Sequence, residues 1–221
     1  MEYVHNVYRL EKSIDIDANW DKSQWTNTEH ALINNYMGEV PGFRPYTEFK
    51  LAYDTDNIYV IFRVEDRYVL CENKNINDPV WKDSCVEFFF APDTNKPDRY
   101  FNLEINCAGT PLMHYNSLPR EQFVELDIED IGKIKIAHSM PGIVYPELTS
   151  QVTWTVEYKI PFEILEKYSK VARPEKGVMW RANFYKIAVN TSNPHYITWS
   201  PVMNDIPDFH LPEFFGRLDF E

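Results

Sequence analysis

A chain of 221 residues has room for one large domain or two small ones and can bury a substantial core without disulfide or metal cross-links. Its formal net charge of −12 argues against nucleic acids and anionic membranes as partners, because both require clustered Lys and Arg. Aromatic residues reach 15%, Gly is scarce at 7 and Pro numbers 15, which favours strands joined by proline-containing turns over helices.

The N-terminal residues do not settle where the protein resides. The stretch MEYVHNVYRL lacks the charged, apolar and small-residue regions of a signal peptide. We therefore expect an extracellular or periplasmic protein if a leader has been removed, and a cytoplasmic protein otherwise. No apolar run approaches the roughly 20 residues that a membrane-spanning helix needs.

Two elements are expected in the first third of the chain. Residues 29–35 are interpreted as a turn or two of helix, and Thr47 to Val64 as a β-hairpin. Apolar residues alternate with polar ones on both sides of the break at residues 54–57, Asp-Thr-Asp-Asn, which is typical of a turn between paired strands.

Short strand patterns dominate the rest of the chain. A proline at a first helical position predicts one short helix over Pro161 to Tyr168. The strand spacing, without an internal repeat or linker, predicts one all-β domain, residues 1–221, folded as an antiparallel two-sheet β-sandwich with one or two short helices. The expected strands are Ser84–Ala91, Tyr100–Asn106, Val124–Leu126, Lys133–His138, Val152–Ile160, Val178–Ala188, Tyr196–Ser200 and Arg217–Phe220.

The cysteines indicate neither a redox site nor a zinc site. Cys71, Cys85 and Cys107 are odd in number and lack the CxxC spacing of such sites. We interpret them as small apolar residues in the reduced state.

A row of polar side chains is predicted on one sheet face. Successive strand residues face opposite ways, so Glu87 points away from the apolar face that carries its two neighbours in sequence. If Phe101 and Leu103 belong to that apolar layer, Asn102 and Glu104 project beside Glu87 from a strand about 4.8 Å away.

Trp81 lies just before the strand that carries Glu87. The charged neighbours Lys82 and Asp83 suggest a solvated loop. A large flat apolar ring beside hydrogen-bonding side chains suits a sugar, which has an apolar C–H face and a rim of hydroxyls. The alternative is that Trp81 folds back onto the edge of the sandwich and serves only in packing.

At this point the sequence resembles the carbohydrate-binding modules of family 9. The likeness is carried by four motifs over nearly the whole chain. In order, they are IDIDANWDKSQW (Ile14 to Trp25), the hairpin FKLAYDTDNIYVIFRVED, the stretch VWKDSCVEFFF, and ITWSPVMNDIPDFHLPEFFGRLDF (Ile197 to Phe220). The resemblance implies an antiparallel β-sandwich that binds sugars without cleaving them, with a role in polysaccharide utilisation and carbohydrate catabolism.

The resemblance also implies which residues contact the sugar. In that family two tryptophans clamp a terminal sugar, and Trp81 matches the first while Phe209 occupies the place of the second. Glu87 matches the sugar-binding carboxylate. Asn102 and Glu104 stand where the family has arginine and asparagine, and Tyr185 is the nearest match to an amide. Further candidates in the loop before LPEFFG are Asn204, as a hydroxyl partner, and His210, as a substitute platform.

Three other interpretations stay open. Glu87 and Glu104 would suit a glycoside hydrolase, whose carboxyl groups lie roughly 5 to 9.5 Å apart, although an open sheet face argues against catalysis. Some sandwiches related to this family hold haem between Met and His, for which Met113 and His114 are examples here. The third interpretation is a structural or partner-binding sandwich.

No cofactor is firmly implied. Related modules often carry structural calcium, and loops such as Asp93 to Asp98 could supply oxygen ligands, but no ordered ligand pattern assigns a metal residue. The expected partner is a mono- or oligosaccharide, with a glycoside hydrolase left open as a catalytic partner.

Overall fold

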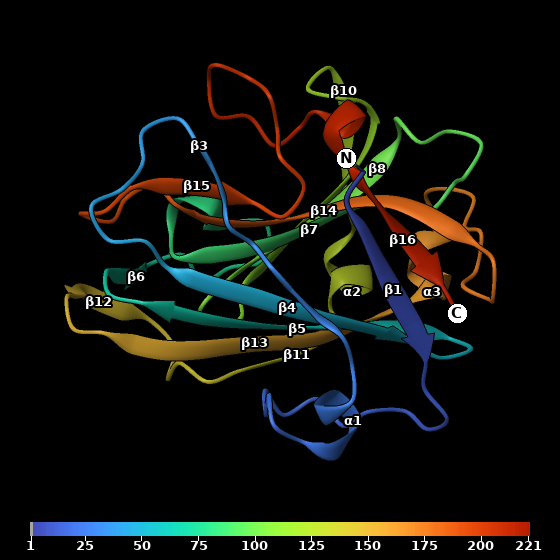
Figure 1. The fold of residues 1–221 in the computed structure, drawn as a ribbon, viewed down its shortest axis with the longest axis horizontal. Coiled ribbons are helices and arrows are strands. Elements are labelled where there is room, and N and C mark those ends of the chain that lie inside the picture. Colours follow the sequence, from blue (N-terminus) through green and yellow to red (C-terminus); the bar gives the residue numbers. More distant parts are fainter. Residues whose placement is uncertain (1) are drawn as a thin grey trace.

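Two layers of β-strands pack face to face in the computed structural model, which describes residues 2–221 and leaves Met1 outside (Figure 1). The first layer has the order β10-β9-β8-β7-β14-β16-β1, with β15 and β3 continuing from β14. Its strands are β1 (Val4–Arg9), β3 (Asn35–Met37), β7 (Cys85–Ala91), β8 (Tyr100–Asn106), β9 (Pro111–Leu118), β10 (Gln122–Glu125), β14 (Met179–Ala188), β15 (His195–Thr198) and β16 (Gly216–Phe220).

The second layer has the order β1-β4-β5-β13-β11, with β2 pairing to β4. The predicted hairpin is confirmed, because β4 and β5 pair in antiparallel register around the Asp54 turn. The strands of this layer are β2 (His30–Leu32), β4 (Tyr46–Tyr53), β5 (Asn57–Asp66), β11 (Lys135–His138) and β13 (Val152–Pro161), while β6 (Val69–Cys71) and β12 (Val144–Leu148) form a separate small sheet.

The expectation of a purely antiparallel sandwich needs correction at β1. This strand pairs in parallel with β16 at residues 4–7 and in parallel with β4 at residues 8–9, so it passes from one layer to the other. Strand periodicity does not distinguish parallel from antiparallel neighbours, and a strand that switches layers carries the same local pattern as one that does not.

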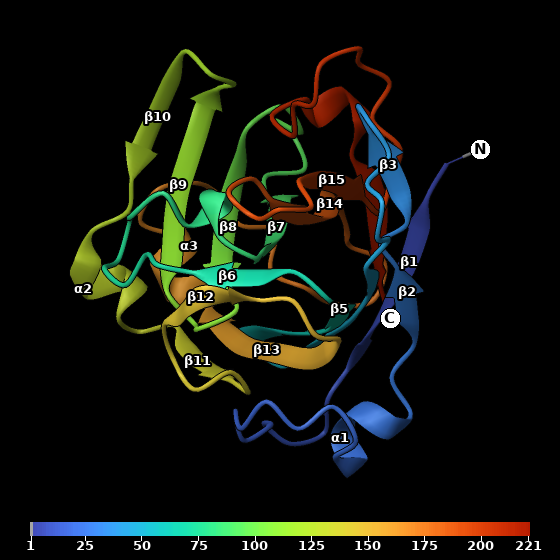
Figure 2. The same cartoon turned by 90° about the vertical axis from the view of Figure 1, so that its left-hand side faces the viewer.

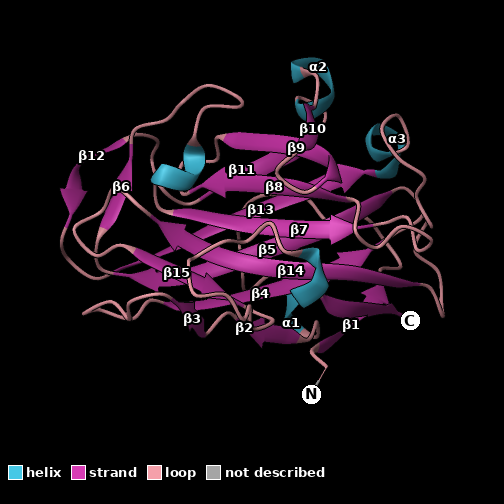
Figure 3. Ribbon diagram, turned by 90° about the horizontal axis from the view of Figure 1, so that it is seen from above, coloured by secondary structure: helices cyan, strands magenta, loops and turns pink. Residues whose placement is uncertain are grey.

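All helices are short: in Figure 3, α2 and α3 lie at the edge of the sheets, whereas other helical turns lie over the strands. The helix predicted over Pro161–Tyr168 is present as the shorter α3, which begins directly after Pro161. The helix predicted over 29–35 is wrong, because residues 30–32 form an edge strand on β4. The helical segments are α1 (Ser23–Thr26), α2 (Ile128–Ile131), α3 (Phe162–Leu165) and the 3₁₀ turns η1 (Val80–Lys82) and η2 (Pro212–Phe214).

The main core lies between the two layers. Val86, Phe88 and Phe90 of β7 and Leu103 of β8 are buried in it, which confirms the predicted alternation of faces. Burial of several large aromatic rings in one layer supplies most of the driving force for folding, since each removes a large apolar area from water. Trp154, Trp180 and Trp199 belong to the same cluster.

Each layer also buries apolar side chains on its outer face. The N-terminal segment packs Trp20 and Trp25 onto β5, and the C-terminal loops pack Phe209 and Phe215 onto β7 and β14. Figure 2 shows the β9–β10 hairpin and the C-terminal loops rising on the same side of the sandwich, away from β11 and β13. The outer face of the first layer is thereby enclosed between them.

All three cysteines are buried. Cys71 and Cys107 belong to the main core, and Cys85 belongs to the apolar cluster on the outer face of β7. They pack as small apolar side chains. Within residues 2–221, none of the helices has the length and apolar character required to cross a membrane.

Candidate functional site

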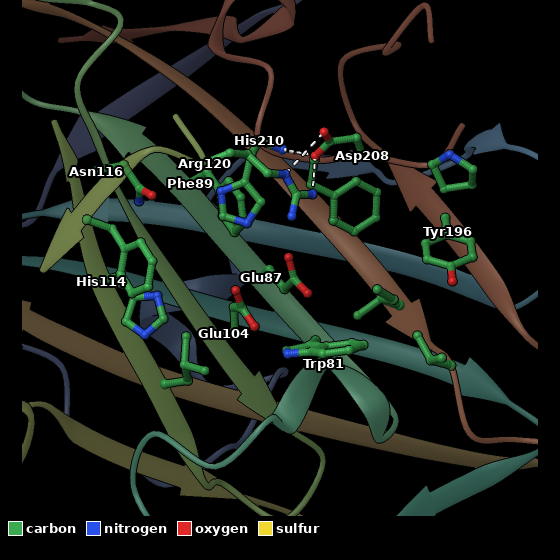
Figure 4. A pocket seen from close by; sticks show the side chains of 16 residues that line it. Trp81, Glu87, Phe89, Glu104, His114, Asn116, Arg120, Tyr196, Asp208 and His210 are labelled. Atoms are coloured by element: carbon green, nitrogen blue, oxygen red, sulfur yellow. Dashed lines mark hydrogen bonds and ion pairs between the residues drawn. The ribbon is translucent and has the colours of Figure 1, made fainter. Parts of the chain in front are cut away.

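A pocket of about 430 Å³ opens on the outer face of the first layer. This volume lies within the roughly 300 to 1,000 Å³ typical of small-ligand sites. Side chains from distant parts of the chain surround it in Figure 4. Its polar lining is Glu87, Glu104, His114, Asn116, Arg120, Tyr196, Asp208 and His210, and its apolar lining is Trp81, Phe89, Leu112, Phe123, Ile187, Val189, Pro207 and Phe209.

Glu87 and Glu104 lie side by side in the pocket. They are directly opposite each other in the antiparallel register of β7 and β8, which is the juxtaposition that strand alternation predicts. Their exposed fractions are only 2% and 5%, because the hairpin and the C-terminal loop cover this face. The expectation of an open sheet face was therefore wrong, since alternation indicates which way a side chain points but not what covers it.

The two carboxyl groups share an environment that disfavours charge. Burial, followed by the proximity of Glu104, raises the pKa of Glu87 well above its ordinary value. Burial also raises the pKa of Glu104 to about 7, although a hydrogen bond from Asn102 opposes the rise. The pair consequently retains at least one proton near neutral pH.

Asn102 orients Glu104 and is absent from the pocket lining. Its Nδ2 donates to Glu104 Oε1 at 2.9 Å, and its Oδ1 accepts from Asn116 Nδ2 at 2.7 Å. Asn102 is 1% exposed, so its amide is enclosed between these two neighbours. The structure therefore places Asn102 behind Glu104 and outside the pocket lining, whereas Asn116 belongs to the lining.

Trp81 lies at the mouth of the pocket. It belongs to η1, whose Val80 is buried against the outer-face cluster and fixes the turn in place. The Trp81 residue is 38% exposed, which is unusual for tryptophan in a chain that buries most of its aromatic rings. In Figure 4 the indole is seen nearly edge-on, with both carboxylates on one side of its plane.

Phe209 and Tyr185 form a packed pair. Their rings stack with centroids 4.1 Å apart, and the Tyr185 hydroxyl donates to the Phe209 carbonyl at 3.1 Å. Tyr185 is fully buried and is absent from the pocket lining, so the structure does not bring it together with the other predicted site residues. Phe209 lines the pocket but is only 6% exposed, so it presents part of a ring rather than an open platform.

The loop before LPEFFG contributes different residues from those predicted. Asn204 is absent from the pocket lining, and its amide donates to the carbonyl of Ile206 at 2.8 Å. His210 does line the pocket, and its Nδ1 lies 2.7 Å from the Tyr100 hydroxyl. Burial lowers the pKa of His210 to about 4, so the ring is neutral at physiological pH.

Sequence reasoning missed five polar residues of the pocket as ligand contacts: His114, Asn116, Arg120, Tyr196 and Asp208. Arg120 lies in the turn between β9 and β10 and donates to both oxygens of Asp208. Alternation within residues 111–116, after the turn at Gly109, was the signal that could have identified β9 and with it His114. The approach of Arg120 to Asp208 joins positions far apart in the chain and leaves no local signal.

The residues named as examples of metal or haem ligands do not gather into such a site. Within residues 2–221, no three His, Cys, Asp or Glu side chains gather as metal ligands, and Asp93 instead accepts the backbone N–H of Asn95. Met113 is buried in the core between the layers, whereas His114 faces the pocket on the opposite side of β9. Neighbouring strand residues that face opposite ways cannot hold one haem between them.

Comparisons with known proteins agree on one family. The sequence profile of carbohydrate-binding family 9 matches residues 17–220. A Bacteroides uniformis crystal structure, to which a carbohydrate-binding role has been assigned, superposes with a TM-score of 0.88 at 27% identity and full coverage of both chains. The search of curated proteins returns no significant match.

Two further solved structures are family 9 modules from Caldicellulosiruptor kristjanssonii. One is in complex with cellotriose and matches with a TM-score of 0.65 at 18% identity, covering 98% of this chain and 93% of that one. The other is in complex with glucose and matches with a TM-score of 0.64 at 17% identity, covering 98% and 95%. At these identities the likeness establishes a shared fold.

Proposed function

Because the chain belongs to carbohydrate-binding family 9, we propose that its outer-face pocket binds a mono- or oligosaccharide without cleaving it. The proposal assigns Trp81 as a stacking platform and Glu87 and Glu104 as hydroxyl partners. It assigns the exposed edge of Phe209 as a second apolar wall and Asn102 as the residue that orients Glu104.

The observation that carries this proposal is the position of Trp81 relative to the two carboxyl groups. A half-exposed indole beside buried acceptors matches the two chemical faces of a pyranose ring, which are apolar C–H groups and a rim of hydroxyls. Asn116 and Tyr196 add neutral hydrogen-bonding groups to the same lining. A pocket that mixes one aromatic face with a few fixed polar groups is the usual form of a small-ligand site.

Sugars of the gluco series are the first ligands to test, since the two Caldicellulosiruptor kristjanssonii relatives hold cellotriose and glucose. We further propose that residues 1–221 act as one binding domain in polysaccharide utilisation, with a glycoside hydrolase as the catalytic partner. Pairing of the N-terminal β1 with the C-terminal β16 supports the single domain, because both ends of the chain complete the same sheet.

Replacing the platform tests the proposal directly. Trp81→Ala should weaken binding of glucose or cellotriose by about 1 to 3 kcal/mol, because it removes the apolar face on which the sugar ring rests. The melting temperature should change little, since Trp81 is not buried in the core. Isothermal titration calorimetry and thermal unfolding supply the two readouts.

Tyr145→Ala is the matched control, since this exposed aromatic residue lies outside the pocket lining. Its sugar affinity should equal that of the unmodified protein. Unchanged affinity in Trp81→Ala, together with a large fall in melting temperature, would show that Trp81 serves packing.

Glycoside hydrolysis is a second candidate that the paired carboxyl groups favour. Their raised pKa values resemble those of a general acid. Both groups, however, project from one floor of the pocket on adjacent strands, whereas hydrolysis requires carboxyl groups that flank the scissile bond. Release of reducing ends from cello-oligosaccharides, abolished in Glu87→Gln, would establish the enzyme and overturn the binding assignment.

A further inference from the structure

The carboxyl pair lacks a compensating cation in the pocket. Arg120 is engaged with Asp208, so that pair is neutral overall. His210 has a pKa lowered to about 4 by burial, and burial also lowers the pKa of His114, so neither ring supplies positive charge at neutral pH. Glu87 and Glu104 therefore share the pocket floor without a free cationic side chain beside them.

Neither neighbouring lysine forms an ion pair with the carboxyl groups. Lys186 faces the interior of the sandwich, where its Nζ lies 3.3 Å from Asp66 Oδ2 and 2.8 Å from His195 Nε2. Lys82 lies outside the pocket lining, with its Nζ 5.2 Å from the centroid of the Trp81 ring. Among residues 2–221, neither lysine forms an ion pair with Glu87 or Glu104, so a cationic ligand can take the place of the proton that the pair retains.

The same pair has unused hydrogen-bond acceptors. Glu104 Oε1 accepts from Asn102, but Glu104 Oε2 is buried without a partner among residues 2–221. Glu87 accepts no side-chain hydrogen bond from the described residues. Three carboxylate oxygens are left, Oε1 and Oε2 of Glu87 and Oε2 of Glu104, one for each N–H of a primary ammonium group.

We propose that the preferred ligand is an amino sugar with a free primary amine, a hexosamine unit whose ammonium group lies between Glu87 and Glu104. This inference rests on the proposed sugar-binding function of the pocket. Charge-assisted hydrogen bonds to both carboxylates are stronger than those from a neutral hydroxyl, and they satisfy acceptors that a hydroxyl leaves partly unpaired. Trp81 then holds the apolar face of the same sugar ring.

The net charge of the chain also favours a cationic sugar as the ligand. A net charge of −12 attracts a cationic sugar and disfavours uronic acids. Binding of the amine also releases a proton, because the proton retained by the carboxyl pair leaves to solvent when the ammonium group takes its place. The other titratable groups around the pair are the partnered or neutral ones described above, together with buried Cys85, Tyr100 and Tyr185 on the same sheet face and Asp83 directly after η1.

Matched sugars test this preference. Isothermal titration at pH 7 compares glucose with glucosamine, galactose with galactosamine and mannose with mannosamine, and the N-acetylated forms serve as uncharged controls. We expect an amine to bind about tenfold or more tightly than its neutral counterpart in at least one pair, because two charged acceptors meet one charged donor. Calorimetric titrations in buffers that differ in ionisation enthalpy should show that a proton is released when the amine binds.

Variants of Glu87 and Glu104 test whether the carboxyl pair causes the preference for amines. Glu104→Gln and Glu87→Gln should each reduce the ratio of amine affinity to neutral-sugar affinity by about tenfold, since each removes one of the two charges. Glu166→Gln, in an exposed pair with Arg173, is the control and should keep the ratio.

The outcomes separate the two proposals. Neutral sugars that bind as tightly as amines in every pair, or a ratio that neither variant changes, would overturn the amine preference and leave the sugar-binding function standing. Absence of binding by every sugar in the panel would overturn both.

Discussion

Glu157 and Glu87 both lie buried on outer faces of the sandwich, on opposite layers, yet their surroundings differ. Glu157 accepts hydrogen bonds from Lys22 Nζ, Trp25 Nε1 and the backbone N–H groups of Asp17 and Ala18, at 2.8 to 2.9 Å. The N-terminal segment thus closes completely around this carboxylate.

Glu87 lies beneath a cover that leaves a pocket. It accepts no hydrogen bond from the described residues, and its nearest charged neighbour in the pocket is another carboxyl group. A buried carboxylate with all acceptors used stabilises a fold, whereas one with free acceptors costs stability until a ligand supplies the donors. The comparison therefore distinguishes a carboxylate whose acceptors are used within the fold from one whose acceptors are free.

The largest effect should follow from breaking the structural carboxylate. Glu157→Ala removes the partner of Lys22, Trp25 and two backbone N–H groups, and we expect it to lower the free energy of unfolding by about 3 kcal/mol or more. Urea denaturation followed by tryptophan fluorescence measures the change. A loss below about 1 kcal/mol would contradict the structural role.

An intermediate effect is expected in the pH dependence of the carboxyl pair. Because the pKa of Glu104 is raised from 4.5 to about 7 in the folded chain, its contribution to stability is present below pH 4.5 and is lost as the pH rises through 7. Glu104→Gln removes the titrating carboxyl group, and with it the fall in stability as the pH rises. The variant should gain about 2 kcal/mol relative to the unmodified protein between about pH 5 and pH 7, at about 1.4 kcal/mol per pH unit at most.

The difference between the two proteins is the quantity to measure. Burial lowers the pKa values of His5 and His210 to about 4, so these histidines destabilise the fold as the pH falls and oppose the trend in either protein alone. Their contribution cancels in the comparison. A difference that stays constant from pH 5 to pH 7 would mean that Glu104 titrates normally.

The smallest effect should come from the ion pair at the rim of the pocket. The Arg120 side chain is 58% exposed, so solvent screens its interaction with Asp208. Arg120→Gln should change the free energy of unfolding by less than about 1 kcal/mol, and added salt should reduce that difference further. Thermal unfolding at low and high salt measures this difference. A fall of more than about 2 kcal/mol in the free energy of unfolding would show that the Arg120 charge stabilises the fold.

Much of the sheet arrangement was predictable from alternation. The pattern in Cys85–Ala91 and Tyr100–Asn106 identified two adjacent strands, and it placed Glu87 beside Glu104 on the face opposite the core. The position of Trp81 ahead of β7 marked the mouth of the pocket. These predictions succeeded because side-chain direction in a strand depends on neighbours in sequence.

The candidate site was predicted only in part. The family resemblance offered Tyr185 and Phe209 as ligand contacts, but their rings stack on each other where the C-terminal loop folds over β14. Arg120 reaches the pocket through a hairpin turn, and its partner Asp208 lies in that loop. Contacts of this kind depend on segments far apart in the chain, so no short pattern encodes them.

The sequence by itself determined an all-β chain, the faces of its central strands and its likeness to sugar-binding modules of family 9. Only the tertiary structure decided that β1 joins the two layers in parallel and that the polar face is a covered pocket. It also decided that Glu157 is saturated with donors while Glu87 is not. The physical reason is that alternation fixes the direction of each side chain, whereas burial and hydrogen bonding depend on which distant segment packs above it.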